Sequence, residues 1–330
     1  MVPRFSYFRA NSIPDALRCL VQNGAHVHAG GTDLLGCARD GVFNLSTVVS
    51  ISGIAALKGI HETPEGGLRI GALTTISEIA GNPLVAAKYR ALSMAAAEVA
   101  SPQLRNQGTL GGNLCQKPRC WYYRGEFNCL RKGGDRCYAP EGENRYHCIF
   151  GGANCYIVHP SDTAPALIAL GASLTIEGLK GRRSVSVEKF HVPPAVDFTV
   201  ETVLKSGEIV TEIILPPPAA GLRSAYRKVR ARQSWDFALA GMASTIVLNK
   251  NQVIHCRMVL SGAAPVPWRI PEAEAAINGR RLRIPPQKPR MQPLKKRNPC
   301  LRTHTKSRCF AQSSSRSSST TLNKILSHGQ

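Results

Sequence analysis

Six of the eleven cysteines lie between residues 115 and 155, and this cluster constrains the fold more than any other sequence feature. The six are Cys115, Cys120, Cys129, Cys137, Cys148 and Cys155. Clustered thiols bind soft metals, and in a reducing compartment they are more often metal-binding or catalytic than disulfide-bonded. Their intervals contain no C-x-x-C pair, so a zinc site is possible without being indicated. An iron–sulfur cluster needs four converging thiolates, which long loops can deliver from irregular spacing.

The surroundings of these cysteines support a metal centre. Trp121, Tyr122 and Tyr123 follow one of them directly and could shield a cluster from water. The alternative is a set of free, buried cysteines, because Cys behaves as a small hydrophobe. Six such residues in so short a segment make that alternative the weaker interpretation.

Two glycine-rich segments, residues 29–33 and 108–113, precede the cysteine region. Glycine permits positive φ and close approach of backbone N–H groups to a phosphate. Neither segment matches G-x-G-x-x-G or G-x-x-x-x-G-K-[ST], so Rossmann and P-loop sites are poor interpretations. Thr32, Thr109 and Asn113 would supply side-chain hydrogen bonds, and Asp33 could accept one from a ribose or a backbone amide. Two such segments beside a cysteine cluster predict a nucleotide cofactor near a metal centre, and hence electron transfer.

The charge is unevenly distributed. The chain of 330 residues carries a net charge of +21, but thirteen of its 42 Lys and Arg lie in residues 279–330, which contain no Asp or Glu. The remainder therefore carries only about +8. A basic, Pro/Ser-rich tail cannot bury a core and is expected to be disordered, which argues against nucleic-acid binding. Without a secretory signal or a membrane-length apolar run, we expect a soluble, cytoplasmic protein.

Short helices and strands alternate along the chain, which predicts an α+β protein. We expect one helix over residues 83–100, a helix capped by Ser77, and a domain boundary at residues 216–218, which are three prolines. A smaller domain follows, with strands at 224–229, 240–249 and 253–261. Its last two strands are joined by a hairpin at 249–251, and a helix begins at Pro271.

Three motifs in this order make the sequence familiar: residues 29–35, 105–114 and 159–164. Over residues 1–283 the chain resembles the FAD-binding subunits of the molybdenum hydroxylases, the xanthine dehydrogenase and aldehyde oxidoreductase family. The resemblance implies an α+β fold with a two-part FAD-binding domain of the vanillyl-alcohol-oxidase (PCMH) type at 1–218. A partial C-terminal domain of the CO dehydrogenase flavoprotein type would follow at 222–283.

The inserted cysteine segment, residues 115–155, resembles the branch that includes 4-hydroxybenzoyl-CoA reductase, whose flavin subunit carries an additional [4Fe–4S] cluster. The cluster ligands implied by this resemblance are Cys120, Cys129, Cys137 and Cys155. Cys148, and after it Cys115, would be the substitutes. The FAD-binding residues implied are Ala29, Gly30, Gly31, Thr32, Asp33, Leu34, Gly108, Thr109, Gly111, Gly112, Asn113, Ser161, Asp162 and Lys228. The alternative for Lys228 is a solvated lysine on a strand.

The implied activity is that of an oxidoreductase subunit. The chain would pass electrons between iron–sulfur clusters and an external acceptor or donor through FAD. Expected partners are a large subunit with the molybdenum cofactor, where the organic substrate is chosen, and a small subunit with [2Fe–2S] clusters. No catalytic general base is expected, and His147 and His159 are interpreted as structural. A free-standing flavin oxidase and a zinc- and nucleic-acid-binding protein are the alternatives.

The tail departs from the family pattern. Members continue through helices after the C-terminal sheet, whereas residues 284–330 lose all periodicity and all acidic residues. We interpret this segment as a disordered basic tail that truncates the small domain. Our hypothesis is that it arose from a shifted reading frame, which resequencing of the last third of the gene can check.

Overall fold

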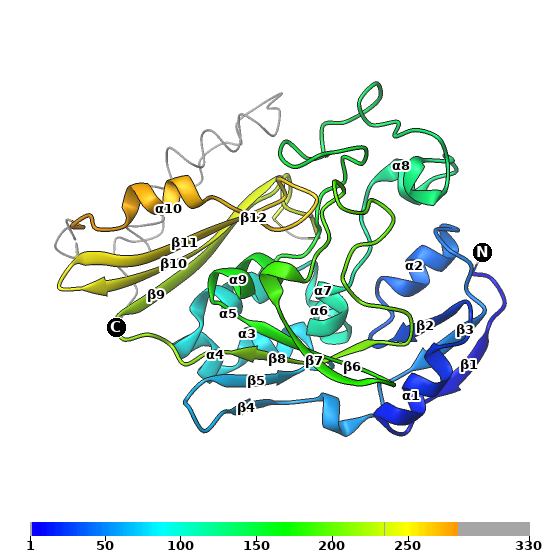
Figure 1. Ribbon diagram of the computed structural model, residues 1–330, viewed down its shortest axis with the longest axis horizontal. Helices are drawn as coiled ribbons and strands as arrows, with labels where there is room; N and C mark the ends of the chain where they lie inside the picture. Colours follow the sequence, from blue (N-terminus) through cyan, green and yellow to red (C-terminus); the bar gives the residue numbers. More distant parts are fainter. Residues whose placement is uncertain (1, 234, 283–330) are drawn as a thin grey trace.

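The computed structural model describes residues 2–233 and 235–282, and the expected basic tail lies outside them (Figure 1). Within these ranges the strands form three sheets. A parallel three-stranded sheet has the order β1-β3-β2, and an antiparallel five-stranded sheet has the order β4-β5-β8-β6-β7. An antiparallel four-stranded sheet, β12-β11-β10-β9, belongs to the C-terminal part of the chain. The expected α+β class is confirmed.

The twelve strands of the described ranges are bounded as follows. They are β1 (Ser6–Arg9), β2 (Ala25–His28), β3 (Thr47–Ser50), β4 (Ile60–Glu62), β5 (Leu68–Gly71), β6 (Ser173–Gly178), β7 (Gly181–Ser186), β8 (Ile209–Leu215), β9 (Leu222–Val229), β10 (Ala240–Asn249), β11 (Gln252–Ser261) and β12 (Trp268–Arg269).

The α-helices of the same ranges are short, and three single-turn 3₁₀ helices accompany them. The α-helices are α1 (Ile13–Leu20), α2 (Leu34–Arg39), α3 (Ile76–Gly81), α4 (Pro83–Lys88), α5 (Arg90–Ala97), α6 (Pro102–Gln107), α7 (Leu110–Leu114), α8 (Trp121–Arg124), α9 (Thr163–Ala169) and α10 (Pro271–Ile277). The 3₁₀ helices are η1 (Ala55–Leu57), η2 (Leu130–Lys132) and η3 (Val187–Lys189).

The parallel sheet positions the first glycine segment. Helix α1 begins at an N-cap, Ser12, whose side chain accepts a hydrogen bond from the Asp15 amide. Its apolar face, which includes Leu17 and Leu20, packs in one hydrophobic cluster with residues of β3 and η1. Strand β2 then ends at His28, and the chain turns directly into Gly30 and Gly31. Burial of α1 thus fixes the strand end from which this turn leaves.

A second, larger core joins the two antiparallel sheets. It contains residues of β5, β6, β8, α3, α5 and α9 together with Tyr226, Ala243 and Val259 of the C-terminal sheet. Two hydrogen bonds cross the same junction: the Ala91 amide donates to Ser224 Oγ at 3.0 Å, and Thr245 Oγ1 donates to the Ala169 carbonyl at 3.0 Å. The C-terminal sheet is therefore fixed on α5 and α9 (Figure 1).

Two local expectations were wrong. The helix expected over 83–100 is two helices, α4 and α5, separated at Tyr89 (φ −136°, ψ 55°). The buried Tyr89 side chain donates a hydrogen bond to the Pro216 carbonyl at 2.6 Å, and the break in the helix accompanies this contact. The cap of α3 is Thr75 in a capping box with Glu78, whereas Ser77 lies inside the helix and donates to Asn106.

The hairpin expected at 249–251 is confirmed. Lys250 and Asn251 both have positive φ, at 44° and 70°, and Asn249 pairs with Gln252. Two successive residues of positive φ match the right-handed twist of the two strands, and asparagine tolerates that conformation.

The cysteine region contains little regular structure beyond α8 and η2. Its far end is held by backbone hydrogen bonds, from Ile149 to the Ala263 carbonyl (2.8 Å) and from Cys148 to the Tyr156 carbonyl (3.0 Å). Figure 1 shows this region as a long irregular excursion above α7, on the side of β12 and α2. Among the described residues, no helix combines the length and apolar character that spanning a membrane requires.

Two buried histidines, His159 and His191, pack against each other. The rings of His159 and His191 are 4.1 Å apart, and both residues are more than nine-tenths buried. His191 Nε2 donates to the Leu114 carbonyl at 3.1 Å. Burial lowers the pKa of His191 to about 4, although this bond opposes the shift. Burial also places the pKa of His159 well below 6.5.

These two imidazoles should make the fold sensitive to acid. Below pH 6.5 these histidines bind protons in the unfolded chain but stay neutral in the folded protein. The free energy of unfolding therefore falls as the pH is lowered to about 4. For His191 alone this loss is about 3 kcal/mol. We expect His159→Phe to reduce the loss of stability between pH 6.5 and 4, measured by urea unfolding across pH. The same exchange at the exposed His255 is the control for the substitution itself. An unaltered profile in His159→Phe would contradict this account.

Candidate functional site

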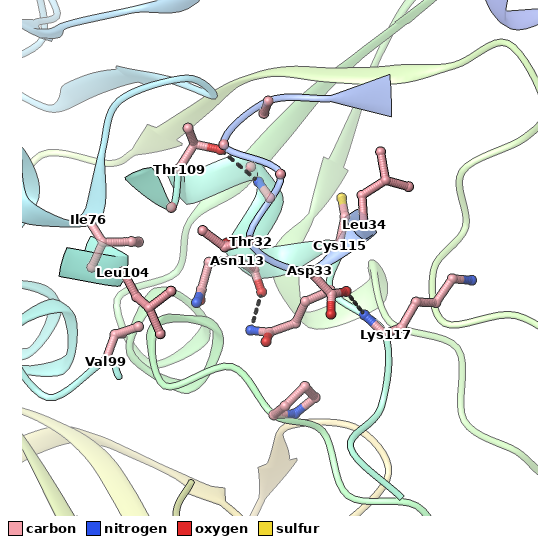
Figure 2. A pocket seen from close by; sticks show the side chains of 18 of the residues that line it. Thr32, Asp33, Leu34, Ile76, Val99, Leu104, Thr109, Asn113, Cys115 and Lys117 are labelled. Atoms are coloured by element: carbon pink, nitrogen blue, oxygen red, sulfur yellow. Dashed lines mark hydrogen bonds between the residues drawn. The ribbon is translucent and has the colours of Figure 1, made fainter. Parts of the chain in front are cut away.

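A cavity of about 530 Å³ lies where the two glycine segments meet (Figure 2). Its wall contains thirteen of the fourteen residues that the resemblance assigned to FAD, and these come from four separate segments of the chain. They are Ala29, Gly30, Gly31, Thr32, Asp33, Leu34, Gly108, Thr109, Gly111, Gly112, Asn113, Asp162 and Lys228. The fourteenth, Ser161, lies in the wall of an adjoining cavity and donates a hydrogen bond to Asn113 Oδ1 at 2.6 Å.

The two glycine segments pack backbone against backbone. A Cβ atom at Gly30 would collide with the carbonyl of Gln107, and Gly31 has a φ of +70°. A Cβ at Gly111 would lie 2.9 Å from that of Ala72. Side chains are excluded at these positions, so main-chain groups form this part of the wall. Such a cradle suits an anionic group held by backbone N–H donors.

The Asp33 carboxylate is hydrogen-bonded to other residues of the protein. Its carboxylate accepts the backbone N–H of Lys117 at 2.7 Å, as Figure 2 shows, and also accepts Arg124 Nη2 at 2.8 Å and Arg119 Nη1. Burial alone would raise the pKa of Asp33, but the two guanidinium groups and the amide hold it below its ordinary value. The sequence suggested that Asp33 accepts a hydrogen bond from a ribose or from a backbone amide, and the structure shows the bond from a backbone amide. The bond ties the first glycine segment to the start of the cysteine region.

Asp162 and Lys228, which also line the cavity, form a buried ion pair. The Lys228 ammonium is 2.7 Å from Asp162 Oδ2 and donates to the Glu98 carbonyl at 3.0 Å. The Lys228 side chain is only 1% exposed, so it is not a solvated strand lysine. Tyr226 donates to the other carboxylate oxygen at 2.7 Å. Burial raises the pKa of Asp162, against the effect of Lys228 and Tyr226.

The structure brings the four predicted cluster ligands to one smaller cavity. Its wall includes Cys120, Cys129, Cys137 and Cys155. The two substitutes lie elsewhere, since Cys115 lines the larger cavity and Cys148 is absent from both walls. Cys120 Sγ is 3.2 Å from His147 Nε2, and burial raises the pKa of Cys120 to about 11. Within residues 2–233 and 235–282, no three His, Cys, Asp or Glu side chains converge as a metal-ion site. Four thiols around one space nevertheless match the donor set of an iron–sulfur cluster.

Several residues of these walls were missed from the sequence. Arg131 lines the cysteine cavity, and Arg119, Lys117 and Glu208 line the larger one. For the three basic residues, the available signal was their position among the cysteines. The partners of Arg131, Lys117 and Arg119 lie 70, 84 and 86 positions away, and local patterns do not reveal such pairs.

Breaking the buried ion pair should destabilise the fold. Lys228→Met leaves the Asp162 carboxylate buried without its cation, which typically costs about 3–5 kcal/mol. Urea unfolding should show this loss, and the double variant Asp162→Asn/Lys228→Met should recover part of it. Removing the exposed partner of Asp236, in Arg232→Gln, should cost less than about 1 kcal/mol. Equal losses in Lys228→Met and Arg232→Gln would count against the buried pair.

Comparison with known proteins places this chain in a family. Residues 3–218 match the FAD binding domain in molybdopterin dehydrogenase, and residues 224–285 match the CO dehydrogenase flavoprotein C-terminal domain. The chain is 37% identical over 281 residues to the aldehyde oxidoreductase FAD-binding subunit PaoB of Escherichia coli K12, covering 83% of this chain and 86% of PaoB. It is 31% identical over 271 residues to the carbon monoxide dehydrogenase medium chain of Hydrogenophaga pseudoflava, covering 81% and 77%.

Solved structures agree with the sequence comparison. A chain of carbon monoxide dehydrogenase from Hydrogenophaga pseudoflava superposes with a TM-score of 0.67 at 28% identity, covering 86% of this chain and 83% of that one. The relatives are dehydrogenase and oxidoreductase subunits, and the family model spans well over half of this sequence. This chain therefore belongs to the FAD-binding subunits of the molybdenum hydroxylase family.

Proposed function

We propose that this chain is the flavoprotein subunit of a xanthine dehydrogenase- or aldehyde oxidoreductase-like complex. It exchanges electrons between iron–sulfur clusters and an external acceptor or donor through FAD. The observation that carries the proposal is the single cavity where thirteen residues expected to bind FAD, from four separate segments, come together. When bound, FAD supplies the redox chemistry, and the protein supplies binding, orientation and electrostatics.

The chain's own residues divide these tasks. The backbone of Gly30, Gly31 and Thr32 holds the anionic pyrophosphate, and Thr109 and Asn113 hold the second side of the cradle. Asp162 and Lys228 place a fixed, buried pair of charges in the wall, where low dielectric strengthens their effect on a bound ring system. No residue of this wall is assigned as a general base.

The smaller cavity takes a [4Fe–4S] cluster in this proposal, with Cys120, Cys129, Cys137 and Cys155 as ligands. Support comes from the four thiols lining one cavity and from Arg131, whose positive charge lies in the same wall. A cation beside the site suits four thiolate ligands, whose negative charge it offsets. When bound, the cluster supplies one-electron transfer, and the protein tunes it through hydrogen bonds and burial.

The partners follow from the relatives. PaoB is named as an FAD-binding subunit, and the carbon monoxide dehydrogenase relative is named as a medium chain. We assign this chain to a cytoplasmic complex with a molybdenum-cofactor large subunit and a [2Fe–2S] small subunit. Residues 1–218 form the FAD-binding domain, with the cluster loop at 115–155, and residues 222–283 form the C-terminal domain that packs against it.

Adding one methyl group to the cradle tests FAD binding. Gly30→Ala places a Cβ against the Gln107 carbonyl, so the two segments must separate. We expect at least a tenfold loss of FAD affinity, measured by quenching of flavin fluorescence, which is about 1.4 kcal/mol. Gly36→Ala is the matched control, because its Cβ would meet only Arg124 Nη1 at 3.8 Å. Full FAD affinity in Gly30→Ala would rule out the cradle.

Iron analysis after anaerobic purification tests the cluster. The wild-type chain should carry FAD and about four iron per flavin, with broad thiolate-to-iron absorbance. Cys129→Ser should lose most of that iron, whereas Cys148→Ser should keep it. Flavin without iron in the wild type would leave FAD binding standing and remove the cluster. Zinc in place of both cofactors would overturn the whole proposal.

A further inference from the structure

Glu201 contacts two cations that belong to different parts of the cysteine region. One carboxylate oxygen accepts Arg131 Nε at 3.1 Å, and the other contacts the Lys117 ammonium. Only 11% of the Glu201 side chain and 2% of the Arg131 side chain are exposed. Glu201 and Arg131 therefore form a largely buried pair in which each depends on the other, because an unpaired buried charge is costly. Lys117, whose side chain is 31% exposed, is the partner nearer the solvent. Glu201 therefore fixes two distant points of an otherwise irregular loop.

Glu201 lies outside that loop, in a segment held by backbone contacts. Its carbonyl accepts the Val192 amide at 3.0 Å, and the neighbouring Thr202 forms a β-bridge with His191. Arg131 makes a second contact with the same segment by donating a hydrogen bond to the Phe198 carbonyl. The loop is thus anchored to the segment between η3 and β8.

From Glu201 the contacts lead to both proposed cofactor sites. Toward FAD, Lys117 lines the larger cavity, and its backbone N–H donates to Asp33 in the first glycine segment. Toward the cluster, Arg131 and Cys155 line the same smaller cavity. A path of polar contacts therefore runs from Asp33 through Lys117 and Glu201 to Arg131, which lies in the same cavity wall as Cys155.

We propose that Glu201 is a positioning residue that couples the two sites, so that an occupied cysteine cavity strengthens FAD binding. The inference rests on the proposed function, since it requires both cofactors. A ligand that fills the cysteine cavity also orders Arg131 in its wall, and through Arg131 it orders Glu201, Lys117 and the Asp33 end of the glycine cradle. FAD then binds a wall that is already ordered and loses less conformational freedom. Coupling of this kind is reciprocal, so bound FAD also strengthens retention of the cluster.

The experiment measures FAD affinity with and without iron. The full chain is purified anaerobically, its iron and flavin are counted, and FAD is removed. FAD is then titrated into the iron-loaded protein and into protein whose iron has been removed by a chelator. We expect the dissociation constant of the wild type to rise at least fivefold on iron removal, the lower end of typical coupling. In Glu201→Gln, which keeps the side-chain shape but not the charge, this ratio should fall to near one.

Two further variants make the result specific. Glu143→Gln removes an exposed ion pair with Arg145 in the same loop and should keep the wild-type ratio. Lys117→Met removes only the flavin-side contact of Glu201 and should also bring the ratio to near one. It decides the question if Glu201→Gln does not fold.

Failure of this inference differs from failure of the proposed function. Wild-type protein with about four iron per FAD but equal affinities in both forms would overturn the coupling alone. A wild-type ratio that persists in Glu201→Gln or Lys117→Met would also overturn it. Absence of iron from the wild type, found before any titration, would overturn the proposed cluster and the coupling with it.

Discussion

The contact between Gly30 and the Gln107 carbonyl is the constraint on which the site depends. It brings the end of the parallel sheet against the turn between α6 and α7 with no side chain between them. The second segment is itself pinned to the five-stranded sheet, because Gly111 donates to the Ala72 carbonyl and Leu110 to the Thr74 carbonyl, both at 2.9 Å. The cavity wall is therefore made of main chain held by two different sheets. Its shape follows from how those sheets pack.

Charge is arranged around this cavity so that each buried carboxylate discussed is neutralised by the protein. Asp33 is paired with arginines from the start of the cysteine region, and Asp162 with Lys228 of β9. Each pair joins segments that are far apart in the sequence, so each also fixes the position of one wall against another. Because these two carboxylates are already paired with cations, they repel an anionic ligand less than free carboxylates would. Such a wall suits a phosphate-containing ligand better than a cationic one.

The two glycine segments that meet at the cavity could be located from the sequence because their signal is local. A residue that must lack a Cβ, such as Gly30, carries that requirement in its identity. Lys228 is different: strand register alone does not say whether its side chain is solvated, and only packing on α5 buries it beside Asp162. Tyr89 illustrates the same limit, since its contact with Pro216 accompanies a break in a helix that propensity alone would continue. Arg131 and Glu201 were out of reach because their pairing joins positions 70 apart.

The cysteine region has too little regular structure to order itself by backbone hydrogen bonding alone. Its aromatic residues supply a small local cluster, in which Tyr122 packs against Phe127 with ring centroids 4.9 Å apart. Beyond that cluster, much of its position depends on ion pairs to Asp33 and Glu201, both outside the loop. Fixing an irregular chain costs about 1–2 kcal/mol per residue in backbone entropy. Contacts to the first glycine segment and to Glu201, in the segment between η3 and β8, offset part of that cost. The loop and the cavity are therefore stabilised by the same residues, which makes them one structural unit.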